Sequence, residues 1–210
     1  MINSKCKICR RLGVKLFLKG EKCLSPKCSM IRKPYPPGQK IKRKKFGGLS
    51  EYGKELKEKQ KLKNWYNLEE RQFRKYVKKA LGARGKVENA DALLIKTLES
   101  RLDNVLFRLG FAVSRLLARQ IVSHRHFLVN GRSINVPSYL VKKGDKINIK
   151  PSSSKKNIFQ NLPSVLKKHK PPSWLELNAE KLEGKVVGEP NLEEAAPPVE
   201  ISSIFEYYSR

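Results

Sequence analysis

The sequence predicts an α+β protein with two parts: a basic, mostly helical amino-terminal domain carrying a four-cysteine module, and a small domain of two helices packed on a short antiparallel sheet. Three observations support this fold class. All four cysteines lie within the first 28 residues. Helical periodicity covers residues 50–81. The stretch Glu99–Ile149 combines two helix patterns with tight-turn signals.

Composition narrows the class of partner. The chain has 210 residues, of which 39% are hydrophobic, so it is long enough for one large or two small cores. Its formal net charge of +27 exceeds what solubility requires, and such a charge costs stability unless a polyanion neutralises it. Nucleic acid is the favoured partner, and an anionic membrane surface is the weaker alternative. Because the sequence lacks a bilayer-length apolar run and a signal-peptide core, we expect a cytoplasmic protein without a membrane partner.

The charge is distributed unevenly along the chain. Glu21 is the only acidic residue among the first 50, whereas acidic residues outnumber basic ones from Trp174 onward. We expect the basic end to face phosphates. The acidic end would be repelled by them, so we predict that it contacts protein, through Glu193, Glu194 and Glu200.

The cysteines follow the pattern Cys6-x2-Cys9-x13-Cys23-x4-Cys28. Two short-spaced pairs separated by a loop are typical of zinc bound by four thiolates. We therefore predict one structural Zn²⁺ in a reducing compartment, which would fold a segment with little apolar content. The alternatives are a chance cluster or two disulfides. Four protein ligands leave no open position for water, so the site is not expected to be catalytic.

A proline-rich segment, Arg32–Gln39, follows the cysteines and predicts an extended path. A run of basic residues comes directly after it: Lys40, Lys42, Arg43, Lys44 and Lys45. We interpret both as an arm that lies along RNA backbone. A solvated linker or a nuclear-localisation-like run are the alternatives.

Residues 50–81 predict two helices, capped at their amino-terminal ends by Ser50 and Asn67. In the second helix, Phe73 and Val77 share an apolar face. Basic side chains occupy the other faces: Arg71, Arg74, Lys75, Lys78 and Lys79.

A further helix is predicted from Asn89 to Gly110, with an apolar stripe from Leu94 to Leu109 and Arg101 on its flank. The stripe is long enough for one continuous helix. It would pack against the sheet of the second domain.

Ser114 is predicted to cap a second short helix, in which Arg115 and Arg119 lie opposite the apolar face. Asn130-Gly131 predicts a tight hairpin, and a second turn at residues 143–145 leads into the strand Lys146–Ile149. Two helices on a short sheet, with cations on one helix and at the turns, are typical of a double-stranded-RNA reader that recognises shape and phosphate geometry. A solvated helix face is the alternative reading of the two arginines.

The predicted RNA-binding residues are therefore basic or polar and lie near the cysteines, on the helices, in the arm and at the turns. They are Arg10, Arg11, Lys40, Lys42, Arg43, Lys44, Lys45, Arg71, Arg74, Lys78, Arg101, Arg115, Arg119, His124, Arg125, Asn130, Arg132, Lys142 and Lys143.

Several motifs give a specific resemblance. The run LESRLDNVLFRLGFA, with VSH, VNG and PSYLVKKGD after it, resembles the central domain of the S4 family of bacterial small-subunit ribosomal proteins. KLFLKG, RKPYPPGQ, LKEKQKLK, ERQFRKY and the terminal EYYSR are also similar to that family, so the resemblance covers nearly the whole chain. The four cysteines match its zinc-bearing branch. Arg125 departs from it, because many relatives carry glycine there.

The resemblance implies a domain organisation. A zinc-bearing helical domain at residues 1–88 would be completed by residues 171–210. An RNA-binding domain would span residues 89–165, and an acidic tail, residues 166–210, would fold back.

The resemblance also implies a function: a structural constituent of the small ribosomal subunit that binds 16S-type ribosomal RNA early in assembly and contributes to translational accuracy near the messenger entry. Implied partners are ribosomal protein S5, other small-subunit proteins and the chain's own messenger RNA. An RNA-modifying enzyme of the pseudouridine-synthase kind and a free messenger-binding repressor are the alternatives. We expect no enzyme and no small-molecule substrate, because the sequence lacks a catalytic constellation or phosphate-binding loop.

Overall fold

The computed structural model describes residues 5–38, 48–83 and 89–210, and the chain forms two compact units. The first unit comprises Met1–Asp91 with Pro197–Arg210, and the second comprises Ala92–Ala196. The predicted cluster Lys40–Lys45 lies outside the described residues. Over the ranges described, no helix is both long and apolar enough to cross a membrane.

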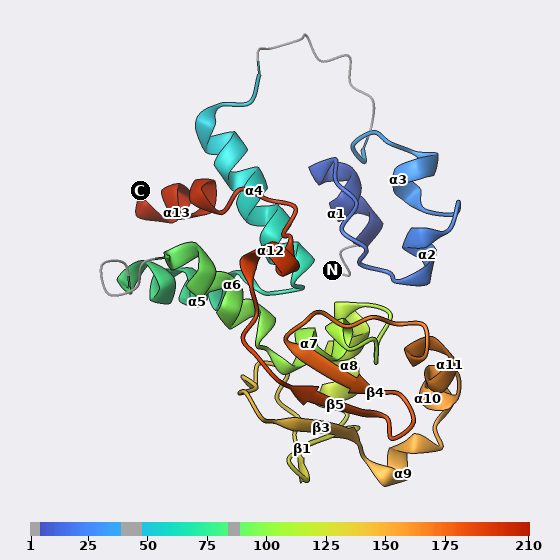
Figure 1. Ribbon diagram of the computed structural model, residues 1–210. Helices are drawn as coiled ribbons and strands as arrows, with labels where there is room; N and C mark the ends of the chain where they lie inside the picture. The colour runs from blue at the N-terminus through green and yellow to red at the C-terminus, as the bar shows by residue number, and fades with distance from the viewer. Residues whose placement is uncertain (1–4, 39–47, 84–88) are drawn as a thin grey trace. The chain divides into compact units, whose positions relative to one another are not determined.

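The first unit is helical (Figure 1). Its helices are α1 (Lys5–Leu12), α2 (Glu21–Leu24), α3 (Ser29–Arg32), α4 (Glu51–Trp65), α5 (Glu70–Gly82), the start of α6 (Ala90–Glu99) and α13 (Ile201–Ser209). Ser50 caps α4 as predicted, because its hydroxyl accepts a hydrogen bond from the Gly53 amide at 3.3 Å. Phe73 and Val77 are buried on α5, which confirms the predicted apolar face.

The predicted cap at Asn67 is wrong. Asn67 has a left-handed backbone, with φ of 54°, and Glu69 occupies the cap position before α5. The Asn67 side chain instead accepts a hydrogen bond from Lys5 Nζ at 2.9 Å. The backbone amide of Asn67 donates to the Asn64 carbonyl, so the residue turns the chain between α4 and α5. Asparagine tolerates this conformation better than most residues.

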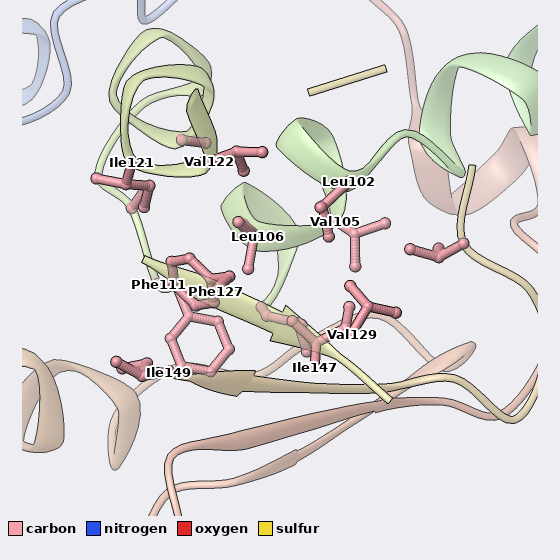
Figure 2. Close-up of a cluster of buried hydrophobic side chains, with 14 of the residues drawn as sticks. Leu102, Val105, Leu106, Phe111, Ile121, Val122, Phe127, Val129, Ile147 and Ile149 are labelled. Atoms are coloured by element: carbon pink, nitrogen blue, oxygen red, sulfur yellow. The ribbon is translucent and has the colours of Figure 1, made fainter. Parts of the chain in front are cut away.

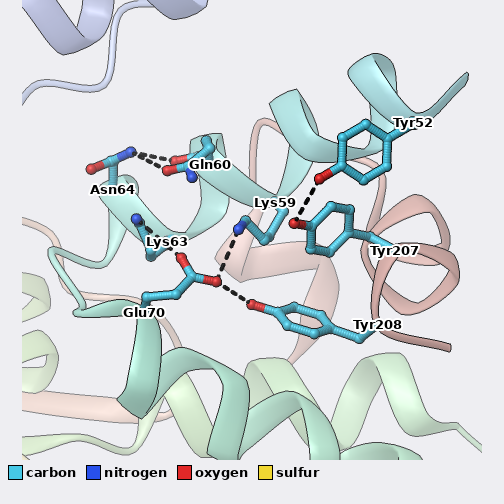
Figure 3. A network of polar contacts seen from close by, with 8 residues as sticks. All are labelled: Tyr52, Lys59, Gln60, Lys63, Asn64, Glu70, Tyr207 and Tyr208. Atoms are coloured by element: carbon cyan, nitrogen blue, oxygen red, sulfur yellow. Dashed lines mark hydrogen bonds and ion pairs between the residues drawn. The ribbon is translucent and has the colours of Figure 1, made fainter. Parts of the chain in front are cut away.

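Helix α13 packs against α4 and α5, although it lies far from them in sequence. Figure 3 shows the polar network that attaches it, centred on the Glu70 carboxylate. Glu70 accepts hydrogen bonds from Tyr208 Oη at 2.7 Å, Lys59 Nζ at 2.9 Å and Lys63 Nζ at 3.2 Å. The Lys59 ammonium also lies 4.6 Å from the centre of the Tyr207 ring.

The second unit is an antiparallel five-stranded sheet covered by helices. Its strand order is β2-β1-β3-β5-β4. The strands are β1 (Phe127–Val129), β2 (Arg132–Ser133), β3 (Lys146–Ile149), β4 (Leu175–Asn178) and β5 (Glu183–Val186). The helices are the rest of α6, α7 (Leu102–Arg108), α8 (Arg115–Ser123), α9 (Pro151–Ser154), α10 (Asn157–Gln160), α11 (Leu162–Leu166) and α12 (Leu192–Ala195).

The core of the second unit lies between the sheet and α7 and α8. Alternate residues of β1 and β3 point toward these helices, and Phe127 pairs with Ile149 and Val129 with Ile147 across the strands. Figure 2 shows these side chains facing the apolar residues of the two helices. The predicted α+β class with an antiparallel sheet is therefore confirmed. The predicted hairpin is confirmed as well, since Asn130 and Gly131 both have positive φ, as a type I′ turn requires.

The predicted continuous helix from Asn89 to Gly110 is wrong, because the structure has two helices, α6 and α7, with an extended residue between them. Arg101 has φ of −71° and ψ of 138°, and it forms an isolated bridge with Leu140. The Leu102 amide donates to the Tyr139 carbonyl at 2.8 Å. Backbone groups that an unbroken helix would pair internally are paired here with the segment before β3.

The carboxy-terminal segment also differs from the expectation that residues 171–210 complete the first domain. Residues 171–196 belong to the second unit, and only residues 197–210 join the first. Trp174 and Leu175 are buried, but in the core of the second unit. Gly184 permits β5 to pack closely against Leu109, because a Cβ at this position would lie 2.4 Å from Leu109 Cδ1.

Candidate RNA-binding surface and cysteine site

The four cysteines lie on three short elements and line one small cavity. Cys6 and Cys9 are on α1, Cys23 is on α2, and Cys28 precedes α3. All four are free thiols, so the alternative of two disulfides does not describe this structure. In the part of the chain described, no three of the histidine, cysteine and acidic side chains are arranged as a metal-ligand group.

The environment of these thiols has a clear physical effect on Cys9. Burial raises the pKa of the Cys9 thiol, and the neighbouring cysteines raise it further. The Lys19 amide donates a hydrogen bond to Cys23 Sγ at 3.4 Å. Thiols are the ligand type that a soft tetrahedral metal such as Zn²⁺ takes, and four of them line this cavity. A bound metal would displace the proton that burial favours on Cys9.

Near the cysteines, the predicted RNA-binding residue Arg10 has an intramolecular role. Its Nε donates to the carbonyls of Lys33 and Tyr35, both at 2.9 Å, and its guanidinium lies 4.9 Å from the centre of the Tyr35 ring. These contacts hold the proline-rich segment against α1. Arg11 is exposed, and so are the three predicted basic residues of α5, Arg71, Arg74 and Lys78.

Two predicted RNA-binding arginines of the second unit are buried, which corrects the prediction. Arg101 is 1% exposed and forms an ion pair with Asp103, with Nη2 2.6 Å from Oδ2. Burial raises the pKa of Asp103, and the Arg101 guanidinium opposes that rise. We did not predict this role, because in the unbroken helix that the sequence indicates Arg101 would lie on a flank.

Arg115 is also buried, with 8% exposure. Its Nε donates to Asn104 Oδ1 at 2.7 Å, and its guanidinium lies 4.5 Å from the centre of the Phe107 ring. It therefore joins α8 to α7 and does not project outward. Arg119 is half-buried, and its charge lies close enough to Asp103 to lower the pKa of that carboxyl.

The remaining predicted residues of the second unit gather near its turns. We call the exposed residues at one end of the sheet the turn surface: Asn130, Arg132, Lys142, Lys143 and Lys146. Hydrogen bonds join the two turns, because Asn130 Nδ2 donates to Asp145 Oδ1 at 2.8 Å and Asn130 Oδ1 accepts from the Lys146 amide at 2.9 Å. The structure thus brings Arg132 of the first turn and the lysines of the second onto one rigid framework.

Two further exposed lysines, Lys146 and Lys185, were not among the predicted RNA-binding residues. The two residues are direct partners across β3 and β5, and both are exposed. Like charges directly opposite in a sheet are destabilising, and Glu176, the partner of Lys185 on β4, offsets part of this repulsion. The alternation of exposed Lys146 with buried Ile147 was a signal that could have identified the first of them.

His124 and Arg125 are exposed where α8 ends. Arg125 adopts a left-handed backbone with φ of 57°, while its amide donates to the Val122 carbonyl and the His126 amide donates to the Ile121 carbonyl. This pair of hydrogen bonds is the Schellman motif, whose left-handed position is usually glycine. An arginine is therefore held there at a conformational cost.

The predicted protein-contact residues are exposed, and two of them also make local contacts. The Glu194 carboxylate accepts hydrogen bonds from the amide and hydroxyl of Ser173. The Glu200 carboxylate accepts one from the Ser203 hydroxyl at 3.1 Å. Their contact with protein stays a prediction, as it does for Glu193.

Comparisons with known proteins decide the family. Residues 1–99 match the model "Ribosomal protein S4/S9 N-terminal domain", and residues 100–147 match the "S4 domain" model. The chain belongs to the ribosomal protein S4 family. It is 48% identical to the small ribosomal subunit protein uS4 of Caldicellulosiruptor bescii over 209 residues, with 100% of this chain and 98% of that protein covered. It is 45% identical to uS4 of Thermus thermophilus, with the same coverage.

Family membership also bears on the alternatives. A further relative, uS4A of Bdellovibrio bacteriovorus, is 48% identical, with 99% of this chain and 97% of that protein covered. The expectation that the chain is not an enzyme is confirmed, because the S4 family consists of structural ribosomal proteins. The S4 domain match ends within β3, so the hairpin of β4 and β5 extends the sheet beyond the matched residues.

Proposed function

We propose that this chain is a structural protein of the small ribosomal subunit, in the cytoplasm, and that it binds small-subunit ribosomal RNA directly. Membership of the S4 family and the names of its relatives support the proposal. The turn surface carries it, because four cations lie on a framework fixed by hydrogen bonds between two turns. The fixed turns hold the Cα positions of these cations together, so their side chains can reach neighbouring backbone phosphates.

The exposed cations of the first unit would provide a second region of contact. Four cations of this unit are exposed: Arg11, Arg71, Arg74 and Lys78. Contact between them and phosphates would neutralise part of the +27 charge of the whole chain. Buried Arg101 and Arg115 are not part of this proposal. The arm at residues 40–45 lies outside the described residues, and its contact with RNA stays a prediction from sequence.

The test is the salt dependence of binding to small-subunit ribosomal RNA. Replacing Lys142 and Lys143 together by alanine should weaken binding and reduce the slope of log K against log salt by about 1.5, because two phosphate contacts are lost. Lys181→Ala is the matched control, since Lys181 is an exposed lysine of the same unit outside the turn surface. Equal losses in the two variants would contradict the assignment of the turn surface.

We also propose that Cys6, Cys9, Cys23 and Cys28 hold one structural Zn²⁺, as in the zinc-bearing branch of the family. Four free thiols from three neighbouring segments line one cavity, which supports this. When bound, zinc would supply a four-coordinate crosslink between α1, α2 and α3. Metal analysis should find one zinc per chain, and a chelator should increase amide exchange in residues 5–33 but not in β1 and β3. Protein purified without zinc and with unchanged exchange would contradict the proposal.

Finer roles follow from the family resemblance alone. They are contact with ribosomal protein S5, a contribution to decoding accuracy, early assembly and repression of the chain's own messenger. We propose the exposed acidic residues Glu193 and Glu200 as the protein-facing part. Charge reversal at these two positions should alter association with small-subunit proteins while the affinity for ribosomal RNA stays the same.

A further inference from the structure

A pocket between α4 and α13 of the first unit contains a buried carboxylate. Glu55 of α4 is 6% exposed, and its Oε1 accepts a hydrogen bond from Arg210 Nη2 at 2.8 Å. Its Oε2 is buried without a hydrogen-bond partner among the residues described. An unsatisfied buried carboxylate oxygen is costly, because the water that solvated it in the unfolded chain has not been replaced by a donor.

The walls of this pocket are polar. Its cavity volume is about 530 Å³, and it is lined by Glu51, Lys54, Glu55, Ser203, Glu206, Ser209 and Arg210. Three carboxylates therefore face two cations, although the chain as a whole has a charge of +27. The Arg210 side chain is 53% exposed, so the cation that pairs with Glu55 is itself open to solvent.

The chemistry of the pocket selects the class of its occupant. An excess of carboxylates repels phosphate, so RNA does not fit. A divalent cation such as Mg²⁺ requires an octahedral set of oxygen ligands, and within the described ranges no three acidic side chains form a metal-ligand group. A guanidinium fits, because it presents five N–H donors in a planar fork and can satisfy two carboxylates at once.

We propose that this pocket, the Glu55 pocket, binds an arginine side chain of a neighbouring basic protein. The arginine displaces the half-exposed Arg210 side chain, and its guanidinium then donates to the Glu55 carboxylate and to Glu206, which lines the same pocket. The inference rests on the proposed function in one respect, since the ribosomal subunit supplies the neighbour. The site itself can be tested without any ribosome.

The experiment uses the full chain and a single probe, N-acetyl-L-argininamide, with N-acetyl-L-citrullinamide as its neutral isostere. Nuclear magnetic resonance follows the amide signals of Ser203 and Ser209. The arginine probe should bind saturably, and the citrulline probe and Mg²⁺ should not compete with it. Saturable binding of the citrulline probe, or displacement by Mg²⁺, would overturn the proposal.

Variants locate the binding energy. Glu55→Gln should weaken binding of the arginine probe by about tenfold, because a charge-assisted pair becomes a neutral one. Arg210→Ala should tighten it, because the resident guanidinium no longer competes for the carboxylate. Unchanged affinity in both variants would show that Glu55 serves only to pair with Arg210, and would overturn the proposal.

Two controls keep the result interpretable. Glu206→Gln changes an exposed position and should weaken binding of the arginine probe even if Glu55→Gln fails to fold. Glu193→Gln, in the second unit, should leave binding of the probe unchanged. Affinity for ribosomal RNA should be the same in Glu55→Gln and the parent chain. A loss of RNA affinity in Glu55→Gln would make the pocket an RNA contact and overturn the inference, while failure of the parent chain to bind RNA would refute only the proposed function.

Discussion

Replacing Glu70 by glutamine tests the attachment of α13 to α4 and α5. Burial raises the pKa of Glu70, but hydrogen bonds from Lys59, Tyr208 and Lys63 outweigh it, so the pKa falls from 4.5 to about 2. At full strength this difference corresponds to about 3 kcal/mol. Because 44% of the Glu70 side chain is exposed, solvent screening reduces the contribution to about 1 kcal/mol.

The pH dependence of this contribution has a definite sign. Glu70 is more acidic in the folded chain than in the unfolded chain, so it stabilises the fold fully above about pH 4.5. The contribution is lost as the pH falls toward about 2. Glu70→Gln should therefore lower the free energy of unfolding by about 1 kcal/mol at pH 7 and by progressively less in acid.

Urea denaturation of the parent chain, Glu70→Gln and Glu69→Gln at pH 7, 4 and 2.5 measures this effect. Glu69 is the matched control, because it is the exposed neighbour and makes no capping hydrogen bond. If the two variants unfold at the same urea concentration at pH 7, the network in Figure 3 does not hold α13 in place. A Glu70→Gln deficit that persists undiminished at pH 2.5 would refute the electrostatic explanation.

Three further substitutions test the second unit by thermal and chemical denaturation. Arg101→Met should lower the free energy of unfolding by about 3 kcal/mol, because Asp103 is left buried without its partner. A loss of stability as small as that of the exposed variant Lys181→Ala would contradict the burial of Arg101. Gly184→Ala should cost about 1–3 kcal/mol through overlap with Leu109, and an unchanged midpoint would show that β5 lies farther from α7. Arg125→Gly should stabilise the chain by about 1 kcal/mol by relieving the left-handed arginine, and destabilisation would disprove that conformation.

Features that depend on neighbouring residues were predictable. Ser50 and Ser114 cap the helices that follow them, since each hydroxyl reaches an amide only three residues away. Asn130-Gly131 forms its hairpin because both residues tolerate positive φ. The motifs also identified the family, and the alternation in Lys146–Ile149 matched β3. In each case the energy that selects the conformation comes from residues close together in the chain.

Other features required partners distant in sequence. Asn67 looks like a cap locally, but the chain turns there with φ of 54° and its side chain contacts Lys5. The strands β4 and β5 join the sheet because an edge of β3 is available to pair with them. No local pattern records the position of that edge, so residues 171–196 were expected in the first domain, whereas they belong to the second unit.

The amino-acid pattern was sufficient to identify an α+β member of the S4 family with cationic turns and clustered cysteines. Which cations remain at the surface depended on the folded chain. The break at Arg101 arises because the backbone there pairs with residues 139–141, and this pairing turns its guanidinium inward toward Asp103. Arg115 is buried because Asn104, eleven positions earlier, supplies its acceptor. Helical spacing records only the direction of a side chain about its own axis, whereas burial depends on what other elements place beside it.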